Sequence, residues 1–359
     1  MAEVLPFESV EALRDASRFD AAWDLWSSVR PASGLDADTI YDWYKLGGDL
    51  GRMAGSWPAA ETAYKQALEA ARELEDEQAL ADVAAALAAV WRAQSRFAEA
   101  LELYDEAAEI YSEYDDAAGL AFVEWGRGGV FRFSGDLPSA LEAFGAALEL
   151  AEQNGLEETA AYALCGLGGA HRASGHYELS LQYYRQANER MHARHDQFGM
   201  AYSHCGVGNA MRMAGQEAEA ELQFSQAAQG YRAIGDIVSY AYTLWSWGTL
   251  HKCQGKLDSA LQMFDESAQL FARSGDRRGA IYARLGSAEV AALQGRASPA
   301  QLTQLVQDSG KLKLGLESAY ACLLAALVAG DSLAVEAAND QLRALGSDFQ
   351  AESLPLNLP

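Results

Sequence analysis

The stretch GLGGAHRASGHYELSLQYYRQA at residues 166–187 returns as GVGNAMRMAGQEAEAELQFSQA at residues 206–227. Several glycines, one arginine, an aromatic residue and a Gln-Ala pair keep their places, while most other letters change. Similarity at a fixed interval is typical of repeat architectures, in which one unit cannot bury its apolar face alone and therefore stacks on the next. The sequence predicts one long array rather than two unrelated globular domains.

The unit is forty residues long and can be aligned on one turn position, called here the reference position. Its members are Gly55, Ser95, Gly135, Gly175, Gly215, Gly255 and Gly295. A small residue follows five positions later, an aromatic residue nine later and a small residue twelve later, as in Ser180, Tyr184 and Ala187. Spacings of four and three place these side chains on one face of a helix. Small residues let a neighbouring helix approach closely, and the aromatic ring fills the space beside them.

A second helix is expected before each reference position. It has a close-contact residue, often glycine, seven positions before the reference position, as in Gly168 and Gly208. The reference glycine suits the left-handed residue that ends a helix. An aspartate suited to cap the next helix recurs between units, at Asp76, Asp116, Asp196, Asp236 and Asp276. Each unit is therefore predicted to be helix, tight turn, helix and short loop.

At these positions the chain resembles the tetratricopeptide repeat family. The matching columns are illustrated by Leu167, Gly168, Gly175, Tyr184 and Ala187. Units of forty residues are similar to those of Pins-type scaffolds and their bacterial relatives. The resemblance implies an all-α fold, a right-handed superhelical solenoid of antiparallel helix pairs with a concave inner surface.

The array divides the chain into four parts. Residues 37–295 hold seven units, the last helix pair running on to about residue 310, and the partial copy SRFDAAWDLW at 17–26 indicates a helix pair within residues 1–36. Residues 296–348 are expected to form a degenerate repeat and a capping helix. The tail at 349–359, which contains the apolar ESLPLNLP (352–359), is expected either to fray or to lie across the last repeat as a cap, and we favour the cap.

One stripe of the first helix, at 13, 10, 6 and 3 positions before the reference position, faces the groove if the resemblance holds. Position 3 is a column of bases: Arg52, Arg92, Arg132, Arg172, Arg212 and Lys252. The aromatic candidates at positions 13 and 10 are Phe122, Tyr162, Tyr202, Tyr242, Tyr282, Trp125 and Trp245. Position 6 is mostly small, with Gly129, Gly169 and the polar Asn209. These small residues are expected to form the floor of the groove and to leave room for a peptide backbone.

These columns predict a binding surface. Arginine pairs with carboxylates through two parallel hydrogen bonds, and tyrosine is frequent at binding hot spots. We therefore expect a non-enzymatic adaptor that binds an acidic or extended peptide segment of a partner protein. The alternative is a sensor of a signalling peptide or small anionic ligand. In a purely structural interpretation, the bases are inherited copies that pair with nearby acids and the tyrosines pack internally.

Other classes of function fit less well. The chain has 51 acidic and 27 basic residues, and its net charge of −24 repels nucleic acids and anionic membranes. His171, His204, His251, Cys165 and Cys205 are too dispersed across repeats to indicate a metal or catalytic site, so no cofactor is expected. The N-terminus does not have the pattern of a signal peptide. The apolar run YACLLAALVAG (320–330) is too short to span a bilayer. The four cysteines form no CxxC motif, which favours reduced thiols in the cytoplasm. The oligomeric state stays open.

Overall fold

The computed structural model describes residues 5–16 and 18–359, and every regular element in that part of the chain is a helix. Ser17, the first residue of the partial copy SRFDAAWDLW, and residues 1–4 of the expected N-terminal pair lie outside the described residues. The helices are α1 (Phe7–Asp15), α2 (Phe19–Ser27), α3 (Ala37–Met53), α4 (Trp57–Leu74), α5 (Glu77–Ala93), α6 (Phe97–Glu113), α7 (Ala117–Ser134), α8 (Leu137–Gln153), α9 (Glu157–Ala173), α10 (Tyr177–Arg194), α11 (Gln197–Met213), α12 (Glu217–Ile234), α13 (Ile237–Cys253), α14 (Leu257–Ser274), α15 (Arg277–Leu293), α16 (Pro299–Lys311), α17 (Gly315–Ala329) and α18 (Ser332–Ala344).

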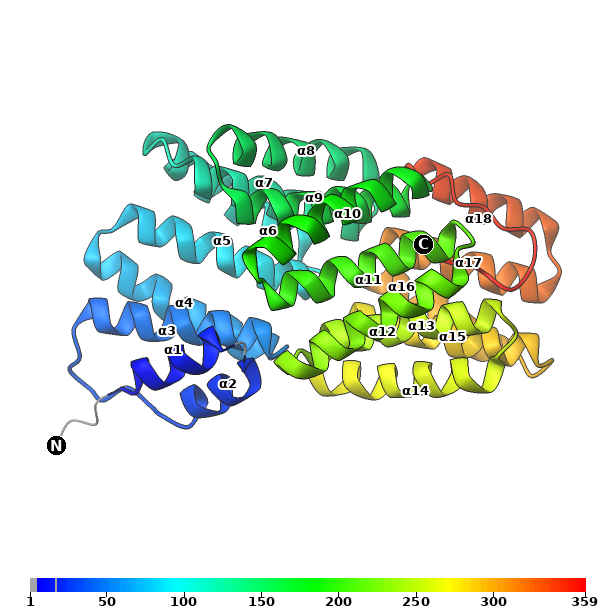
Figure 1. Cartoon of the computed structure of the whole chain (residues 1–359), viewed down its shortest axis with the longest axis horizontal. Coiled ribbons are helices and arrows are strands. Elements are labelled where there is room, and N and C mark those ends of the chain that lie inside the picture. Colours follow the sequence, from blue (N-terminus) through cyan, green and yellow to red (C-terminus); the bar gives the residue numbers. More distant parts are fainter. Residues whose placement is uncertain (1–4, 17) are drawn as a thin grey trace.

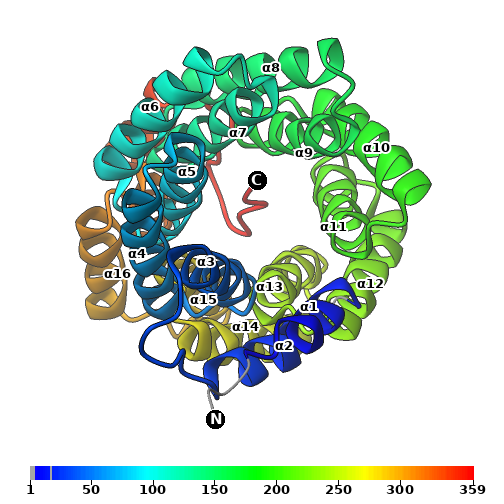
Figure 2. The same cartoon turned by 90° about the vertical axis from the view of Figure 1, so that its left-hand side faces the viewer.

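Consecutive helices form antiparallel pairs that stack in chain order (Figure 1). Seen end-on, the odd-numbered helices from α3 to α15 form an inner layer and their even-numbered partners an outer layer (Figure 2). The predicted all-α superhelical solenoid is confirmed.

The aromatic column and the glycine column pack into one another. A Cβ atom added to Gly168 would lie 2.8 Å from the Tyr184 ring of the same repeat, and one added to Gly206 of the next repeat would lie 2.1 Å from that ring. The ring is therefore held between two glycines of consecutive repeats, and Tyr184 is almost fully buried. The paired glycines serve helix packing, because only a residue without a side chain leaves room for the ring.

Turns and caps separate the helices as expected. Gly175 has φ +89°, in the left-handed region that glycine enters without steric cost, and Ser95 adopts φ +63° at the equivalent turn. Asp196 caps α11 by accepting a hydrogen bond of 2.8 Å from the Gly199 amide. At the one turn where the aspartate is replaced, Leu156 offers no side-chain cap to α9.

Successive turns of the superhelix contact one another. The α3–α4 turn meets the α13–α14 pair, since a Cβ on Gly55 would lie 2.8 Å from Val238 Cγ2. The α7–α8 turn meets the start of α17, where a Cβ on Gly135 would lie 3.1 Å from the Cα of Gly315. Both contacts join helix pairs five steps apart, so one turn takes about five pairs.

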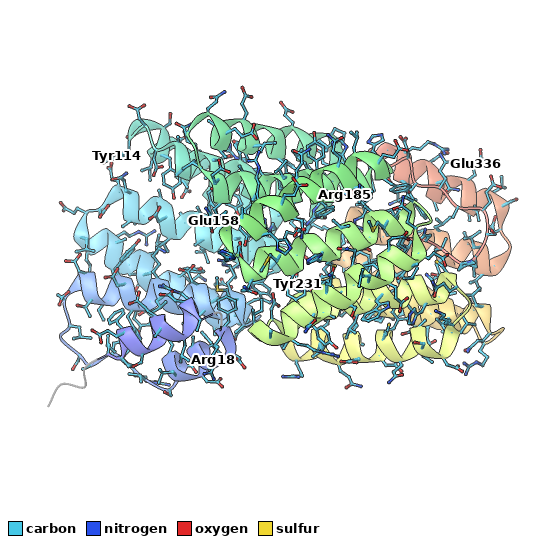
Figure 3. All side chains as sticks on the ribbon, in the orientation of Figure 1. Arg18, Tyr114, Glu158, Arg185, Tyr231 and Glu336 are labelled. Atoms are coloured by element: carbon cyan, nitrogen blue, oxygen red, sulfur yellow. The ribbon has the colours of Figure 1, made fainter. Side chains whose placement is uncertain are left out.

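The outer surface carries much of the charge. Glu158, Arg185 and Glu336, labelled in Figure 3, are exposed, and Glu158 pairs with Arg194 at 2.7 Å. Tyr231 of α12 is buried instead, with its ring centroid 5.9 Å from that of Phe198 on α11. None of the helices in the described part of the chain is long and apolar enough to cross a membrane.

Candidate functional site

The predicted stripe lies on the inner layer of helices. Arg212 of α11 and Lys252 of α13 donate hydrogen bonds to the backbone carbonyls of Leu358 and Leu356. Figure 2 shows this last part of the chain inside the ring of helices. Equivalent positions of stacked repeats share one orientation. The base column from Arg52 to Lys252 therefore faces the axis of the superhelix. We call the surface formed by the four stripe positions the inner face.

Three of the bases reach across to the next repeat. A Cβ atom on Gly129 of α7 would lie 2.1 Å from Arg92 Nη1 of α5, and one on Gly169 of α9 would lie 2.3 Å from Arg132 Nη1 of α7. In the same way Lys252 of α13 reaches Glu289 of α15, with its Nζ atom 2.5 Å from the Glu289 carboxylate. The expectation that the glycine floor leaves room for a ligand backbone is wrong at these two positions, because the arginine of the preceding repeat occupies it.

Three arginines in the middle of the column carry uncompensated charge. Within residues 5–16 and 18–359, no acidic side chain lies within ion-pair distance of Arg92, Arg132 or Arg172. The Nε atom of each is buried and has no hydrogen-bond partner there. Burial, together with the positive charges of Arg132 and Arg52, lowers the pKa of Arg92. Buried charges are normally paired, so these three arginines stand out on the inner face.

Aromatic rings give Arg92 and Arg132 partial compensation. The Arg92 guanidinium carbon lies 5.2 Å from the centroid of Trp125 and 5.6 Å from that of Phe133, and Arg132 lies 5.2 Å from Phe133. Cation–π contacts of this kind attract a cation but leave its N–H donors free. Phe122, which neighbours Trp125 at 5.8 Å, completes the aromatic group.

The first base of the column has a different environment. Arg52 approaches Asp49 of its own helix at 4.0 Å, and Asp49 accepts a hydrogen bond of 2.6 Å from the Tyr64 hydroxyl. Lys45 also lies 3.4 Å from Asp49. The N-terminal end of the inner face is therefore closer to charge balance than its middle.

The last two bases hold the C-terminal segment. Arg212 Nη2 donates to the Leu358 carbonyl at 2.7 Å, and its Nη1 donates to the side-chain oxygen of Asn357. Lys252 donates to the Leu356 carbonyl at 2.7 Å, and Glu289 accepts the Leu356 N–H. Burial, with the nearby charge of Arg172, lowers the pKa of Arg212 to about 10.

The tail does not cap the last repeat as expected. Ala351 exchanges two hydrogen bonds with the Asn339 side chain of α18, but the chain beyond it leaves the last pair. Leu356 and Leu358 are buried, with 0% and 2% of their surface exposed. The inner face offers these residues apolar burial and partners for their backbone groups, and both would be lost in an outward position.

The polar candidate Asn209 links two repeats. Its Oδ1 accepts from Arg212 at 3.1 Å, and its Nδ2 donates to Ser246 of α13 at 3.0 Å. It positions the guanidinium that contacts the tail and does not itself contact the tail.

The aromatic column is largely engaged in the scaffold. The Tyr162 hydroxyl donates to the capping Asp196 at 2.8 Å, and burial and that carboxylate raise the pKa of Tyr162. Tyr242 donates to the capping Asp276 at 3.2 Å. The other two tyrosines pack against rings: Tyr202 lies 6.1 Å from Phe198 and Tyr282 lies 4.4 Å from Trp245.

Sequence reasoning missed four contributors. Glu289 stands in the position-6 column one repeat after Lys252, and an acid beside a base column was the signal for a buried pair. Phe133 follows Arg132 and is the one aromatic residue at its place in the unit. Arg278 lies 4.2 Å from Phe133 and pairs with the buried Glu317 at 2.6 Å; neither has a counterpart in the repeat pattern.

The histidines and cysteines do not gather into a site. Within the described residues no group of three His, Cys, Asp or Glu side chains is arranged to hold a metal ion. The four cysteines are unpaired thiols, and burial raises the pKa of Cys165.

Comparison with known proteins identifies the repeat. Residues 39–113, 79–153 and 118–191 match the tetratricopeptide repeat family. No curated protein matches the sequence.

Among solved structures, a Rap protein complexed with competence and sporulation factor has a TM-score of 0.70 at 16% identity and covers 94% of this chain and 95% of its own. The Rap conjugation gene regulator of plasmid pLS20, in complex with a Phr peptide, has a TM-score of 0.65 at 18% identity. The match covers 76% of this chain and 74% of the regulator. Apo RapI has a TM-score of 0.55 at 17% identity, and the match covers 78% of this chain and 98% of RapI. At these identities the likeness shows the fold alone; the match to the tetratricopeptide repeat family covers residues 39–191, and the stacked helix pairs continue beyond it.

Proposed function

We propose that this chain is a peptide-binding regulator or adaptor, whose inner face takes an extended segment with carboxylate groups. The observation that carries the proposal is the group of Arg92, Arg132 and Arg172, three half-buried arginines without acidic partners in the described chain. In a protein of net charge −24, acids for internal pairing are plentiful, yet none of the described ones lies beside these three.

The geometry suits an extended ligand. Helices pack roughly 8–10 Å apart, so bases in consecutive repeats are spaced by about 10–20 Å. A peptide that advances roughly 3.3 Å per residue meets one base every few residues. Carboxylates are the partners that arginine binds in two parallel hydrogen bonds. Net negative charge disfavours nucleic acid and anionic membranes as the partner, and the role proposed is binding rather than catalysis, in the cytoplasm.

The solved relatives support a peptide ligand. One similar Rap protein is complexed with competence and sporulation factor, and another is in complex with a Phr peptide. A free signalling peptide is therefore the alternative to a segment of a partner protein. A small anionic ligand is a third source of the same carboxylate chemistry.

The test uses fluorescent eight-residue peptides that carry zero to three glutamates, titrated by anisotropy at two salt concentrations. The intact chain is compared with Arg132→Gln/Arg172→Gln, which keeps polar groups of similar size, and with Arg185→Gln on the outer layer. We expect the double variant to bind the acidic peptides at least tenfold more weakly, since hydrogen bonds to charged groups are each worth about 1.5–3 kcal/mol. Arg185→Gln should bind normally.

Equal affinity of the double variant and the intact chain, with helical circular dichroism unchanged, would contradict the proposal. Displacement of the peptide by citrate at equal concentration would favour the small-ligand alternative. Tighter binding of longer acidic segments would favour the adaptor role.

A further inference from the structure

The C-terminal segment of the chain is bound where a peptide ligand is proposed to bind. We propose that residues 354–359, LPLNLP, are a built-in ligand of the inner face, and that the subsite of Arg212, Lys252 and Glu289 recognises a neutral, leucine-bearing peptide that competes with this segment. The inference rests on the proposed function, and it adds a second ligand chemistry and an internal competitor.

The subsite binds both backbone groups of one residue. Lys252 donates to the Leu356 carbonyl at 2.7 Å, while Glu289 accepts the Leu356 N–H. Lys252 and Glu289 come from consecutive repeats, pair at 2.5 Å and are almost fully buried. A preformed ion pair that offers one donor and one acceptor binds an extended backbone whatever its side chain.

A second contact reads the neighbouring residues. Arg212 donates to the Leu358 carbonyl at 2.7 Å and to the side-chain amide oxygen of Asn357. Arg212 is in turn oriented by Asn209 at 3.1 Å. This contact recognises the Asn357 side chain, and the burial of Leu356 and Leu358 favours leucine on either side of it, so the subsite favours a Leu-Asn-Leu pattern.

Charge explains why this ligand is neutral. Glu289 already compensates Lys252, so an acidic residue placed at Leu356 would meet a buried carboxylate. Residues 353–359 carry no charged side chain, and none of them forms an ion pair with Arg92, Arg132 or Arg172. The subsite around Lys252 is therefore distinct from the middle of the column, which calls for an anion.

The tail is anchored before it enters the inner face. Ser347 donates to the Ala173 carbonyl at 2.6 Å, and the Asp348 amide donates to Ser174 at 3.0 Å, both at the end of α9. A segment tethered by a short linker has an effective concentration of about millimolar. A free peptide binds only the fraction of molecules whose tail has left, so its apparent affinity falls by that fraction.

The experiment releases the tail in the full chain. Leu356→Asp places a charge against Glu289 and leaves the inner face itself unaltered; Glu352→Gln, at an exposed residue four positions after the anchored Asp348, is the matched control. The probe is fluorescein-labelled LPLNLP, followed by anisotropy. We expect the Leu356→Asp chain to bind the probe at least tenfold more tightly than the native chain, and Glu352→Gln to match the native chain.

A second measurement follows the tail itself. By hydrogen exchange, the amide of residue 356, which donates to Glu289, should be protected in the native chain, and its protection should fall by at least tenfold in Leu356→Asp. A probe with Asn357 replaced by alanine should bind the released chain several-fold more weakly. Random-coil exchange of the Leu356 amide in the native chain, or failure of the folded Leu356→Asp chain to bind the probe any tighter, would overturn the inference.

The two proposals fail separately. Binding of the acidic peptides with no binding of LPLNLP by the released chain overturns the built-in ligand alone. Binding of LPLNLP with no response to glutamate content or to Arg132→Gln/Arg172→Gln overturns the carboxylate proposal alone.

Discussion

At the scale of single residues, one position decides whether a base on the inner face has a counter-ion. Three of the bases extend over position 6 of the next repeat, where Lys252 meets Glu289 but Arg92 and Arg132 meet Gly129 and Gly169. Glycine supplies space and no charge, so the guanidinium fits without being neutralised. The choice of glycine or glutamate thereby sets which of these bases has a buried counter-ion.

Gly169→Ala tests this role of glycine. The new Cβ would lie 2.3 Å from Arg132 Nη1, so the end of a flexible side chain must move aside. Alanine also favours the helix by up to about 1 kcal/mol. We expect the free energy of unfolding to stay level or rise by up to about 1 kcal/mol, while affinity for acidic peptides falls several-fold.

The control for this variant is Gly145→Ala in α8, where an added Cβ has nothing within 4 Å. In urea unfolding this variant should gain the same stability from the higher helix propensity of alanine, and its affinity for acidic peptides should be unchanged. A loss of affinity in both variants would show that the effect does not arise from Arg132.

At the scale of helices, Glu61 joins three elements through hydrogen bonds. On α4 it accepts from Trp91 of α5 at 3.2 Å, from Gln94 at 3.0 Å and from Arg96 before α6 at 3.0 Å, and Lys65 lies 2.7 Å away. Burial opposes its ionisation, but the hydrogen bonds from Lys65, Gln94 and Trp91 outweigh burial and lower the pKa of Glu61 to about 2.

This shift predicts a pH dependence. The folded pKa lies below the ordinary value of 4.5, so the stabilisation is present above about pH 5 and is lost as the pH falls towards 2. About 1.4 kcal/mol per unit gives roughly 3 kcal/mol. We expect Glu61→Gln to lower the free energy of unfolding by about 2–3 kcal/mol at pH 7, with the difference vanishing near pH 2 in urea titrations.

Glu102→Gln provides the comparison, because Glu102 is exposed on α6. Its unfolding should follow the native chain at every pH. A Glu61→Gln deficit of equal size at pH 7 and pH 3 would mean that the carboxylate acts through its shape and not through its charge.

The helices and their packing were predictable from the sequence because they repeat. The clamp around Tyr184 is built from residues within two adjacent units, so each copy of the pattern carries it. The tail was not predictable, since Arg212 and Leu358 are 146 residues apart and the segment has no periodicity. The base column was found, but its counter-ions depend on which side chain the next repeat presents, and the repeat pattern does not specify that contact.

At the scale of the whole molecule, the turns of the superhelix are held together by a few close contacts. The Leu137 amide donates to the Leu345 carbonyl at 3.3 Å, which joins the α7–α8 turn to the end of α18. Next to it, the first residue of α17, Gly315, contacts the end of α7. The C-terminal segment leaves α18 from this junction, so the same contacts position the segment for the inner face.

Gly315→Ala should loosen the junction. Its Cβ would lie 2.4 Å from the Ser134 carbonyl oxygen and 3.2 Å from the Gly135 Cα, which are backbone atoms that cannot rotate away. Overpacking of this kind costs about 1–3 kcal/mol.

Gly310→Ala in α16 makes the same chemical change where nothing lies within 4 Å, and helix propensity predicts a gain in stability of up to about 1 kcal/mol. We expect urea unfolding to separate the two variants in opposite directions, and small-angle scattering to show a larger maximum dimension for Gly315→Ala alone. Hydrogen exchange at Leu356 should rise in that variant, because the tail loses its fixed point of entry; unchanged exchange with a clear loss of stability would show that the tail docks independently of the junction.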